Sequence, residues 1–132
     1  MSRPADWAPL AGSDPVSGDP AAVKKLADRY RDTATAIDNA VKRLRAIHDD
    51  SSGAWVSPAG TAFRERTGEM ADSIARAFGR YDRAATALAS YSGKLDSVQE
   101  RADDLLAKAK VAQEAADDAE RDACPSTRRR CC

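Results

Sequence analysis

The chain has 132 residues, of which 42% are hydrophobic, 5% aromatic and 32% charged, and its formal net charge is zero. This length has room for one domain, and the small aromatic fraction favours thin helical layers over a deep core that encloses a substrate pocket. The charge balance argues against nucleic acid as a partner, since phosphate binding needs a basic excess on one face. No stretch approaches the roughly 20 apolar residues of a membrane span, so stable membrane insertion is not expected.

Residues 1–18 are predicted to form an irregular N-terminal segment, because Pro, Gly, Ser and Asp interrupt any regular pattern. Trp7, Leu10 and Val16 nevertheless supply apolar side chains that need a surface to pack on. The segment also lacks the apolar core of a cleavable signal peptide. Secretion of this protein would therefore require a route that reads no such signal.

The first helix is expected over about 20–48. Asp19 can cap its free amides, and Pro20 suits the first helical position, where its missing N–H costs nothing. Two interleaved seven-residue series follow and end in the polar turn 49–57. They are Val23, Tyr30, Ile37, Leu44 and Ala27, Ala34, Val41, His48.

The second helix is expected over about 58–122, after a second cap and proline at Ser57 and Pro58. It too carries two seven-residue series, the pattern of a helix that lies along another helix. A disordered tail is expected over 123–132. The two series are Phe63, Met70, Ala77, Ala84, Tyr91, Val98, Leu105, Ala112, Ala119 and Thr67, Ile74, Tyr81, Leu88, Leu95, Ala102, Ala109, Ala116.

The predicted fold is therefore all-α: an antiparallel helical hairpin, 19–122, with a coiled-coil-like seam and a long second helix. A turn near Trp55 sets a register in which late residues of the first helix meet early residues of the second. The prediction pairs Val23, Tyr30, Ile37 and Leu44 with Leu88, Tyr81, Ala77, Ile74 and Met70.

The second helix is the longer one, and the first can cover it only to about Leu88 at 1.5 Å per residue. We expect Trp7 and Leu10 to fold back onto it between about Leu88 and Val98. The remaining apolar residues of this part are candidates for binding a partner. The candidates are Tyr91, Leu95, Val98 and Leu105.

The connection between the helices carries Trp55, Ser57 and Gly60, followed by Ala62-Phe63 and a charged turn. This arrangement resembles the Trp-x-Gly helical-hairpin superfamily of type VII (ESX) secretion substrates. The stretch from Trp7 to Pro20, with Gly12, Asp14-Pro15 and Gly18-Asp19-Pro20, is similar to the actinobacterial targeting domain found at the front of polymorphic toxins. The resemblance implies a turn motif made of Trp55, Ser57, Gly60 and Phe63.

The resemblance further implies a non-catalytic module that is secreted without a cleavable signal peptide. Its partners would be a small helical-hairpin protein, or a second copy of itself, and the type VII export ATPase. Ser57 stands where the superfamily has glycine, and four residues after Tyr30, Tyr81 and Tyr91 no Asp or Glu follows. The missing Tyr-x-x-x-Asp/Glu export motif favours a signal that a partner helps to present.

Little in the sequence indicates a catalytic or metal-binding role. His48 ends a helix, where the helix dipole favours a cation, and a structural role is the simpler interpretation. Cys124, Cys131 and Cys132 lack the paired Cys-x-x-Cys spacing of zinc sites. No Ser/His/Asp set or glycine-rich phosphate loop is present. We expect no enzyme activity, no cofactor and no metal.

Two other functions share the same helices. A cytoplasmic structural or adaptor coiled coil would need neither the Trp55 turn nor the stretch from Trp7 to Pro20. An amphipathic surface-active protein would need Lys and Arg to dominate its polar face. The distal part of the second helix is acidic instead, with Glu114, Asp117, Asp118, Glu120 and Asp122.

Overall fold

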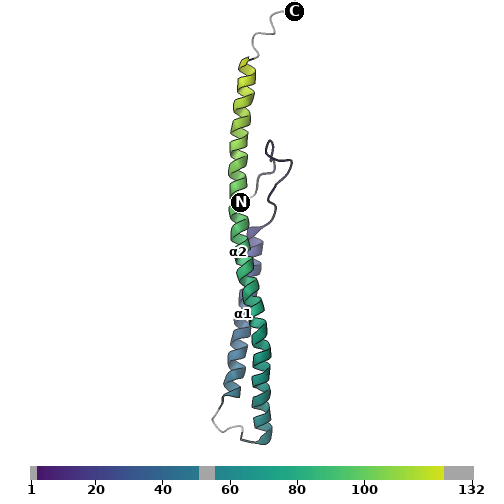
Figure 1. Ribbon diagram of the computed structural model, residues 1–132, viewed down its shortest axis with the longest axis vertical. Helices are drawn as coiled ribbons and strands as arrows, with labels where there is room; N and C mark the ends of the chain where they lie inside the picture. Colours follow the sequence, from purple (N-terminus) through teal and green to yellow (C-terminus); the bar gives the residue numbers. More distant parts are fainter. Residues whose placement is uncertain (1–2, 51–55, 124–132) are drawn as a thin grey trace, which may run out of the picture. The chain divides into compact units, whose positions relative to one another are not determined.

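The computed structural model describes residues 3–50 and 56–123. Within these ranges the chain forms two helices and no strand: α1 spans Pro20–His48 and α2 spans Pro58–Ala123 (Figure 1). The predicted all-α helical hairpin with a long second helix is thereby confirmed. Trp55, Cys124, Cys131 and Cys132 lie outside the described residues.

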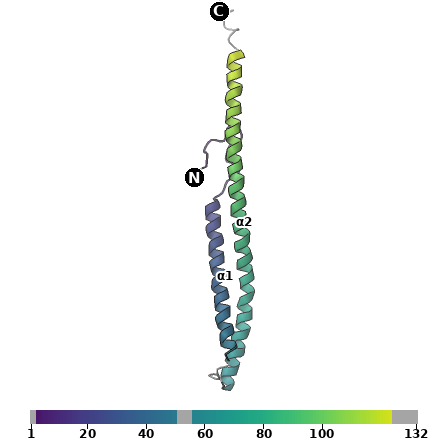
Figure 2. The same ribbon diagram turned by 90° about the vertical axis from the view of Figure 1, so that its left-hand side faces the viewer.

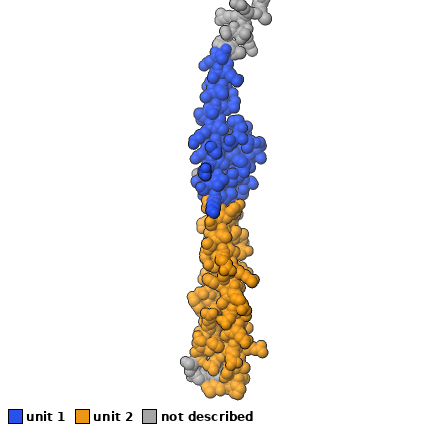
Figure 3. All heavy atoms as spheres, in the orientation of Figure 1, with its two compact units in different colours: residues 1–18, 94–132 blue, residues 19–93 orange. Residues whose placement is uncertain are grey.

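The chain divides into two compact units (Figure 3). One unit consists of Asp19–Gly93, which holds α1 and the first part of α2. The other consists of Met1–Gly18 and Lys94–Cys132, which joins the N-terminal segment to the second part of α2. These are called here the hairpin unit and the strap unit.

Both helices begin as the sequence predicts. The Asp19 carboxylate accepts a hydrogen bond of 3.0 Å from the Ala22 amide, and Pro20 takes the first helical position. At the start of α2, the Ser57 hydroxyl accepts a hydrogen bond of 3.1 Å from the Gly60 amide. Each cap satisfies an amide that has no partner within its own helix, which fixes where the helix starts.

In the hairpin unit, α1 lies alongside the first part of α2 in both views (Figures 1 and 2). The rings of Tyr30 and Tyr81 lie 5.6 Å apart, centroid to centroid. Near the open end of the hairpin, the Ser92 hydroxyl donates a hydrogen bond of 2.8 Å to the Pro20 carbonyl. These contacts join the start of α1 to residues well along α2, so the two helices run antiparallel.

Small side chains occupy the most deeply buried positions between the two helices. On α1 these are Ala27, Ala34 and Val41, while the larger residues Val23, Tyr30, Ile37 and Leu44 are only half-buried. On α2 they include Thr67, Ala71, Ala85 and Ser92. Small residues let two helices approach closely, and the larger neighbours then close the contact from either side.

One of the two predicted series on α2 is therefore wrong by one residue. Phe63, Met70 and Tyr91 are 47%, 53% and 55% exposed, whereas Ala71 and Ser92 are buried. Each residue turns an α-helix by about 100°, so this displacement moves a whole series from the contact to its edge. The prediction followed the bulkiest apolar residues, but the helices pack through the small residues beside them.

In the strap unit, residues 3–18 cover part of α2 and are called the strap. The Trp7 side chain is only 2% exposed and packs in a cluster with Ala102 and Leu106. This contact lies beyond the expected range of Leu88 to Val98. Leu10 is 43% exposed, so the prediction that it shares the burial of Trp7 is wrong.

Candidate interaction surface

The two edges of the helix contact in the hairpin unit differ in chemistry. Along one edge, Arg31 pairs with Asp82 at 2.5 Å and also donates to the Thr86 hydroxyl at 3.2 Å. Arg45 pairs with Asp72 at 3.5 Å along the same edge. Exposed ion pairs of this kind add little stability, but they make this polar edge a poor surface for apolar contacts.

The opposite edge is apolar and is called the apolar flank. Leu26, Met70 and Tyr91 on this edge each directly precede a buried residue, and the edge therefore lies on the other side of the contact from the ion pairs. Leu26 and Ile47 on α1 are 43% and 37% exposed, and Met70 and Tyr91 on α2 are 53% and 55% exposed. Phe63 is 47% exposed and shares the repeat position of Met70 and Tyr91. The smaller residues Thr33, Ala40, Ala77 and Ala84 fill the steps between the large ones.

A stripe of this width is more than a two-helix contact needs. A helix that pairs with one other helix buries two positions in each seven, whereas a helix inside a bundle uses a third, adjacent position. Leu26, Met70 and Tyr91 supply this third position with large apolar side chains. The pattern is that of a hairpin which presents one edge to further helices.

The strap unit carries the other sequence-predicted candidates. Val98 and Leu105 continue the Met70 and Tyr91 series along α2 and are 45% and 55% exposed. Leu95 differs from them, because it is 8% exposed. A side chain at Gly18 would come within 3.1 Å of Leu95, so Leu95 lies under the strap and is not an available surface residue.

Polar contacts hold the strap on α2, and the sequence analysis did not predict them. The buried Gln99 amide donates to the carbonyls of Val16 and Gly18, at 3.0 Å each. Arg3 donates to Asp14 at 2.6 Å and 2.8 Å, to Asp103 at 3.0 Å and to the Gln99 carbonyl at 3.1 Å. Gln99 stands among the apolar residues Leu95, Ala102 and Leu106 at helical spacing, which was the signal for it, and no periodic signal marks Arg3.

The ion pair between Arg3 and Asp14 shifts the pKa of both residues. The hydrogen bond from Arg3 is the main reason that the pKa of Asp14 lies below its ordinary value, and a hydrogen bond from the Val16 amide adds to it. The same hydrogen bond raises the pKa of Arg3. The Arg3 guanidinium also lies over the Trp7 ring, 4.9 Å from its centroid, which adds a cation–π attraction.

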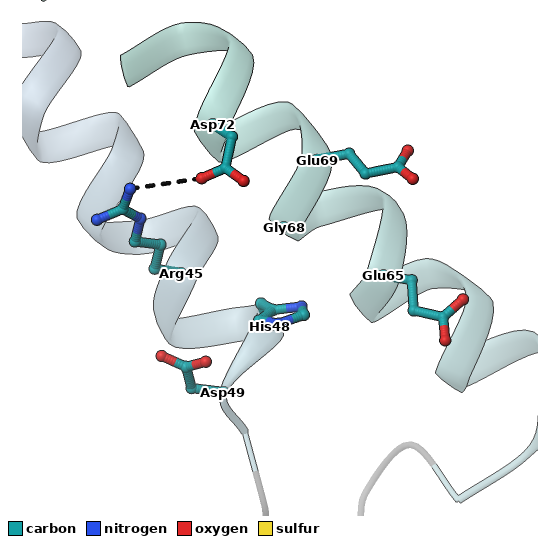
Figure 4. A pocket seen from close by; sticks show the side chains of 7 residues that line it. All are labelled: Arg45, His48, Asp49, Glu65, Gly68, Glu69 and Asp72. Atoms are coloured by element: carbon teal, nitrogen blue, oxygen red, sulfur yellow. Dashed lines mark hydrogen bonds and ion pairs between the residues drawn. The ribbon is translucent and has the colours of Figure 1, made fainter. Parts of the chain in front are cut away.

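A polar hollow of about 510 Å³ lies in the hairpin unit, at the end where α1 stops (Figure 4). His48 Nδ1 donates a hydrogen bond of 2.8 Å to the Arg64 carbonyl, which holds the imidazole ring. Gly68 makes room for that ring, because a Cβ atom there would lie 2.8 Å from His48 Nδ1. The hollow is lined by Arg45, His48, Asp49, Glu65, Gly68, Glu69 and Asp72.

This hollow is a structural feature of the hairpin end. His48 is held by a backbone carbonyl and Arg45 by Asp72, so two of its polar groups already have protein partners. Within residues 3–50 and 56–123, no group of three or more His, Cys, Asp and Glu side chains is arranged to hold a metal ion. The apolar flank is thus the better candidate for a functional site.

Most of the chain matches a known protein family. Residues 12–129 match the model of the family described as "Putative T7SS secretion signal domain". The chain belongs to this family. Family membership indicates a role in secretion targeting, with export through the type VII system.

The other comparisons are silent, since no curated protein and no solved structure matches the chain. Across the described part of the chain, neither helix has a segment that combines the length and apolarity needed to cross a bilayer.

Proposed function

We propose that this chain is a non-catalytic targeting module whose apolar flank binds a small helical-hairpin partner, and that the pair is delivered to the type VII export ATPase. The family match supports targeting. The observation that carries the partner is the contrast between the two edges of the hairpin contact. Arg31 and Arg45 make one edge polar, while Leu26, Met70 and Tyr91 leave the other apolar and exposed.

Helical partners fit this flank better than a folded globular surface does. The exposed side chains share one position of the seven-residue repeat on each helix, with smaller residues between them, and this matches the spacing of side chains on a second, nearly parallel helix. Single exposed apolar residues are common on soluble proteins, but a sustained stripe marks an interaction site. A two-helix partner would complete a bundle and remove these side chains from water.

We further propose that the module is the leader region of a secreted toxin and needs no cleavable signal peptide. The support is the stretch from Trp7 to Pro20, which is similar to the targeting domain at the front of polymorphic toxins. In the structure most of the strap belongs to this stretch, and Trp7 anchors it to α2. A targeting module of this kind would direct export while a separate effector part does the chemistry.

The test is a secretion assay with a reporter fused to the end of the full chain, in a host with an active type VII system and a co-expressed hairpin partner. Changing Met70 and Tyr91 to Lys should abolish export, because the charges would have to be buried against the partner. Ala89→Lys is the matched control, since Ala89 is exposed and lies seven residues after Asp82, on the polar edge. Export equal to wild type in the flank variant would exclude this surface.

The same secretion assay distinguishes a targeting module from a protein that stays in the cell. A cytoplasmic structural or adaptor coiled coil would retain the reporter inside the cell for every variant, the unchanged chain included. Trp55→Ala should weaken export without reducing helix content if the predicted turn motif takes part in recognition. Export of the unchanged chain without any partner would contradict partner dependence while leaving the targeting role in place.

A further inference from the structure

The part of α2 under the strap has the character of a helix-pairing surface. Gln99 and Leu106 follow Ser92 at seven-residue steps, and Leu95 and Ala102 continue the series of Thr67 at the same spacing. Thr67 and Ser92 are buried in the hairpin unit, as Leu95, Gln99, Ala102 and Leu106 are in the strap unit. The four residues Leu95, Gln99, Ala102 and Leu106 are called the covered strip.

The strap that covers this strip is irregular, and few of its residues hold it on α2. Trp7 is the only residue of the described strap that is fully buried, while Leu10 stays 43% exposed. Ala11 and Val16 are smaller and pack, partly buried, against the same cluster as Trp7. The other contacts are polar: Arg3 reaches Asp103, and Gln99 bonds two carbonyls of the strap. Water can replace such polar contacts at little cost, so release of Trp7 is the main barrier to opening.

Gln99 indicates what replaces the strap when it opens. A buried side-chain amide needs both donors and acceptors, and a second amide at the same level supplies both. One polar residue among apolar core positions is the device by which paired helices fix register and number of strands. Two copies of the covered strip in parallel would place Gln99 against its own counterpart.

We propose that the strap is a removable latch, and that its opening lets the covered strip pair in parallel with the same strip of a second copy of the chain. The latched chain hides Leu95, Ala102 and Leu106 beneath Trp7 and the strap backbone. The unlatched chain bares them along a single helix. The pairing continues along α2 the seven-residue pattern that already packs the hairpin, and it does not depend on the role in secretion.

The experiment compares the mass of wild type and Trp7→Ala by sedimentation equilibrium at tens of micromolar. Trp7→Ala should increase the weight-average mass by up to about twofold relative to wild type, because it removes the buried anchor. Leu10→Ala is the matched control, since Leu10 lies on the same strap but is exposed, and it should sediment as wild type does. Hydrogen exchange over residues 3–18 checks that the strap has opened.

Two further variants assign the pairing to the covered strip. In the Trp7→Ala background, Leu106→Lys should restore the wild-type mass, whereas Leu105→Lys should not, because Leu105 is exposed beside the strip. A peptide of residues 3–18 added in excess should also restore it, and the same peptide with Trp7→Ala should have no effect. Arg3→Glu weakens the latch by a different route and should shift the mass in the same direction.

Several outcomes would overturn the proposal. An opened strap with an unchanged mass would show that the covered strip does not pair. A strap that stays protected from exchange in both Trp7→Ala and Arg3→Glu would show that it is no latch. A mass increase that survives Leu106→Lys would place the new contact elsewhere on the chain.

Discussion

The hairpin unit and the strap unit cover the same helix in different ways. In the hairpin unit, α1 covers α2 through small residues such as Ala34 and Ala71, in many similar contacts. In the strap unit, one large side chain, Trp7, and hydrogen bonds from Arg3 and Gln99 cover it instead. A repeating helical surface therefore accepts either a regular or an irregular cover, but the irregular one depends on single residues.

Substitutions in the strap and in the hairpin affect two different free energies. The free energy of closing the strap can be followed by Trp7 fluorescence in a Trp55→Phe background, since the chain has two tryptophans. The free energy of unfolding of the hairpin can be followed by circular dichroism.

Leu106→Ala should destabilise closure of the strap by about 2–5 kcal/mol, the usual cost of truncating a buried leucine. Leu106 is 3% exposed and packs with Trp7. Leu105, which the sequence analysis favoured, is 55% exposed, and Leu105→Ala should change closure by less than about 0.5 kcal/mol. Equal effects of the two variants would reject the assignment of the covered strip.

Ala71→Leu should destabilise the hairpin by about 1–3 kcal/mol, because Ala71 is 0% exposed and the helices have no room for added methylenes. Met70→Leu, one residue earlier, is the control and should leave the melting curve almost unchanged. A stable Ala71→Leu variant would mean that the two helices lie farther apart than described.

Gly18→Ala should weaken closure of the strap by about 1–3 kcal/mol. Gly18 has φ of +133°, which a residue with a side chain rarely adopts, and an added Cβ would come within 3.1 Å of Leu95. Gly12→Ala provides the comparison, since nothing lies within 4 Å of a Cβ atom there. If the two alanine variants close equally well, the described backbone at Gly18 is wrong.

The smallest expected effect is the pH dependence of the strap. The pKa of Asp14 is lowered by Arg3, so its contribution to closure is fully present above the unfolded value of about 3.9 and is lost as pH falls through the folded value. Closure measured by Trp7 emission should weaken below about pH 4. Asp14→Asn should remove this acid dependence, and an unchanged acid profile would exclude the ion pair as its cause.

The sequence was sufficient for the helical architecture. Asp19-Pro20 and Ser57-Pro58 mark the starts of the helices, since capping is a local property of a few residues. The sequence did not show which side of α2 packs against α1. Ala71 and Met70 both fit a seven-residue apolar pattern, and only the close approach of the two helices decides between them.

The strap shows a different limit of prediction. A lone tryptophan in an irregular segment indicates that its side chain will be buried. The segment has no sequence repeat, however, so the residues that bury the tryptophan cannot be predicted. Trp7 consequently packs near Ala102 and Leu106, farther along α2 than chain length suggested, and Leu10 stays exposed. The Arg3 contacts depend on that path and could not be anticipated. Trp55 remains a prediction, because it lies outside the described residues.

The most direct test of two modes of cover on one helix is hydrogen exchange along α2 in wild type and Trp7→Ala. At a protein concentration too low for two copies to pair, exchange should accelerate in Trp7→Ala at the amides of residues 95–106, which the strap covers, and stay unchanged from Thr67 to Ser92, which α1 covers. Equal acceleration in both stretches, or in neither, would contradict this expectation.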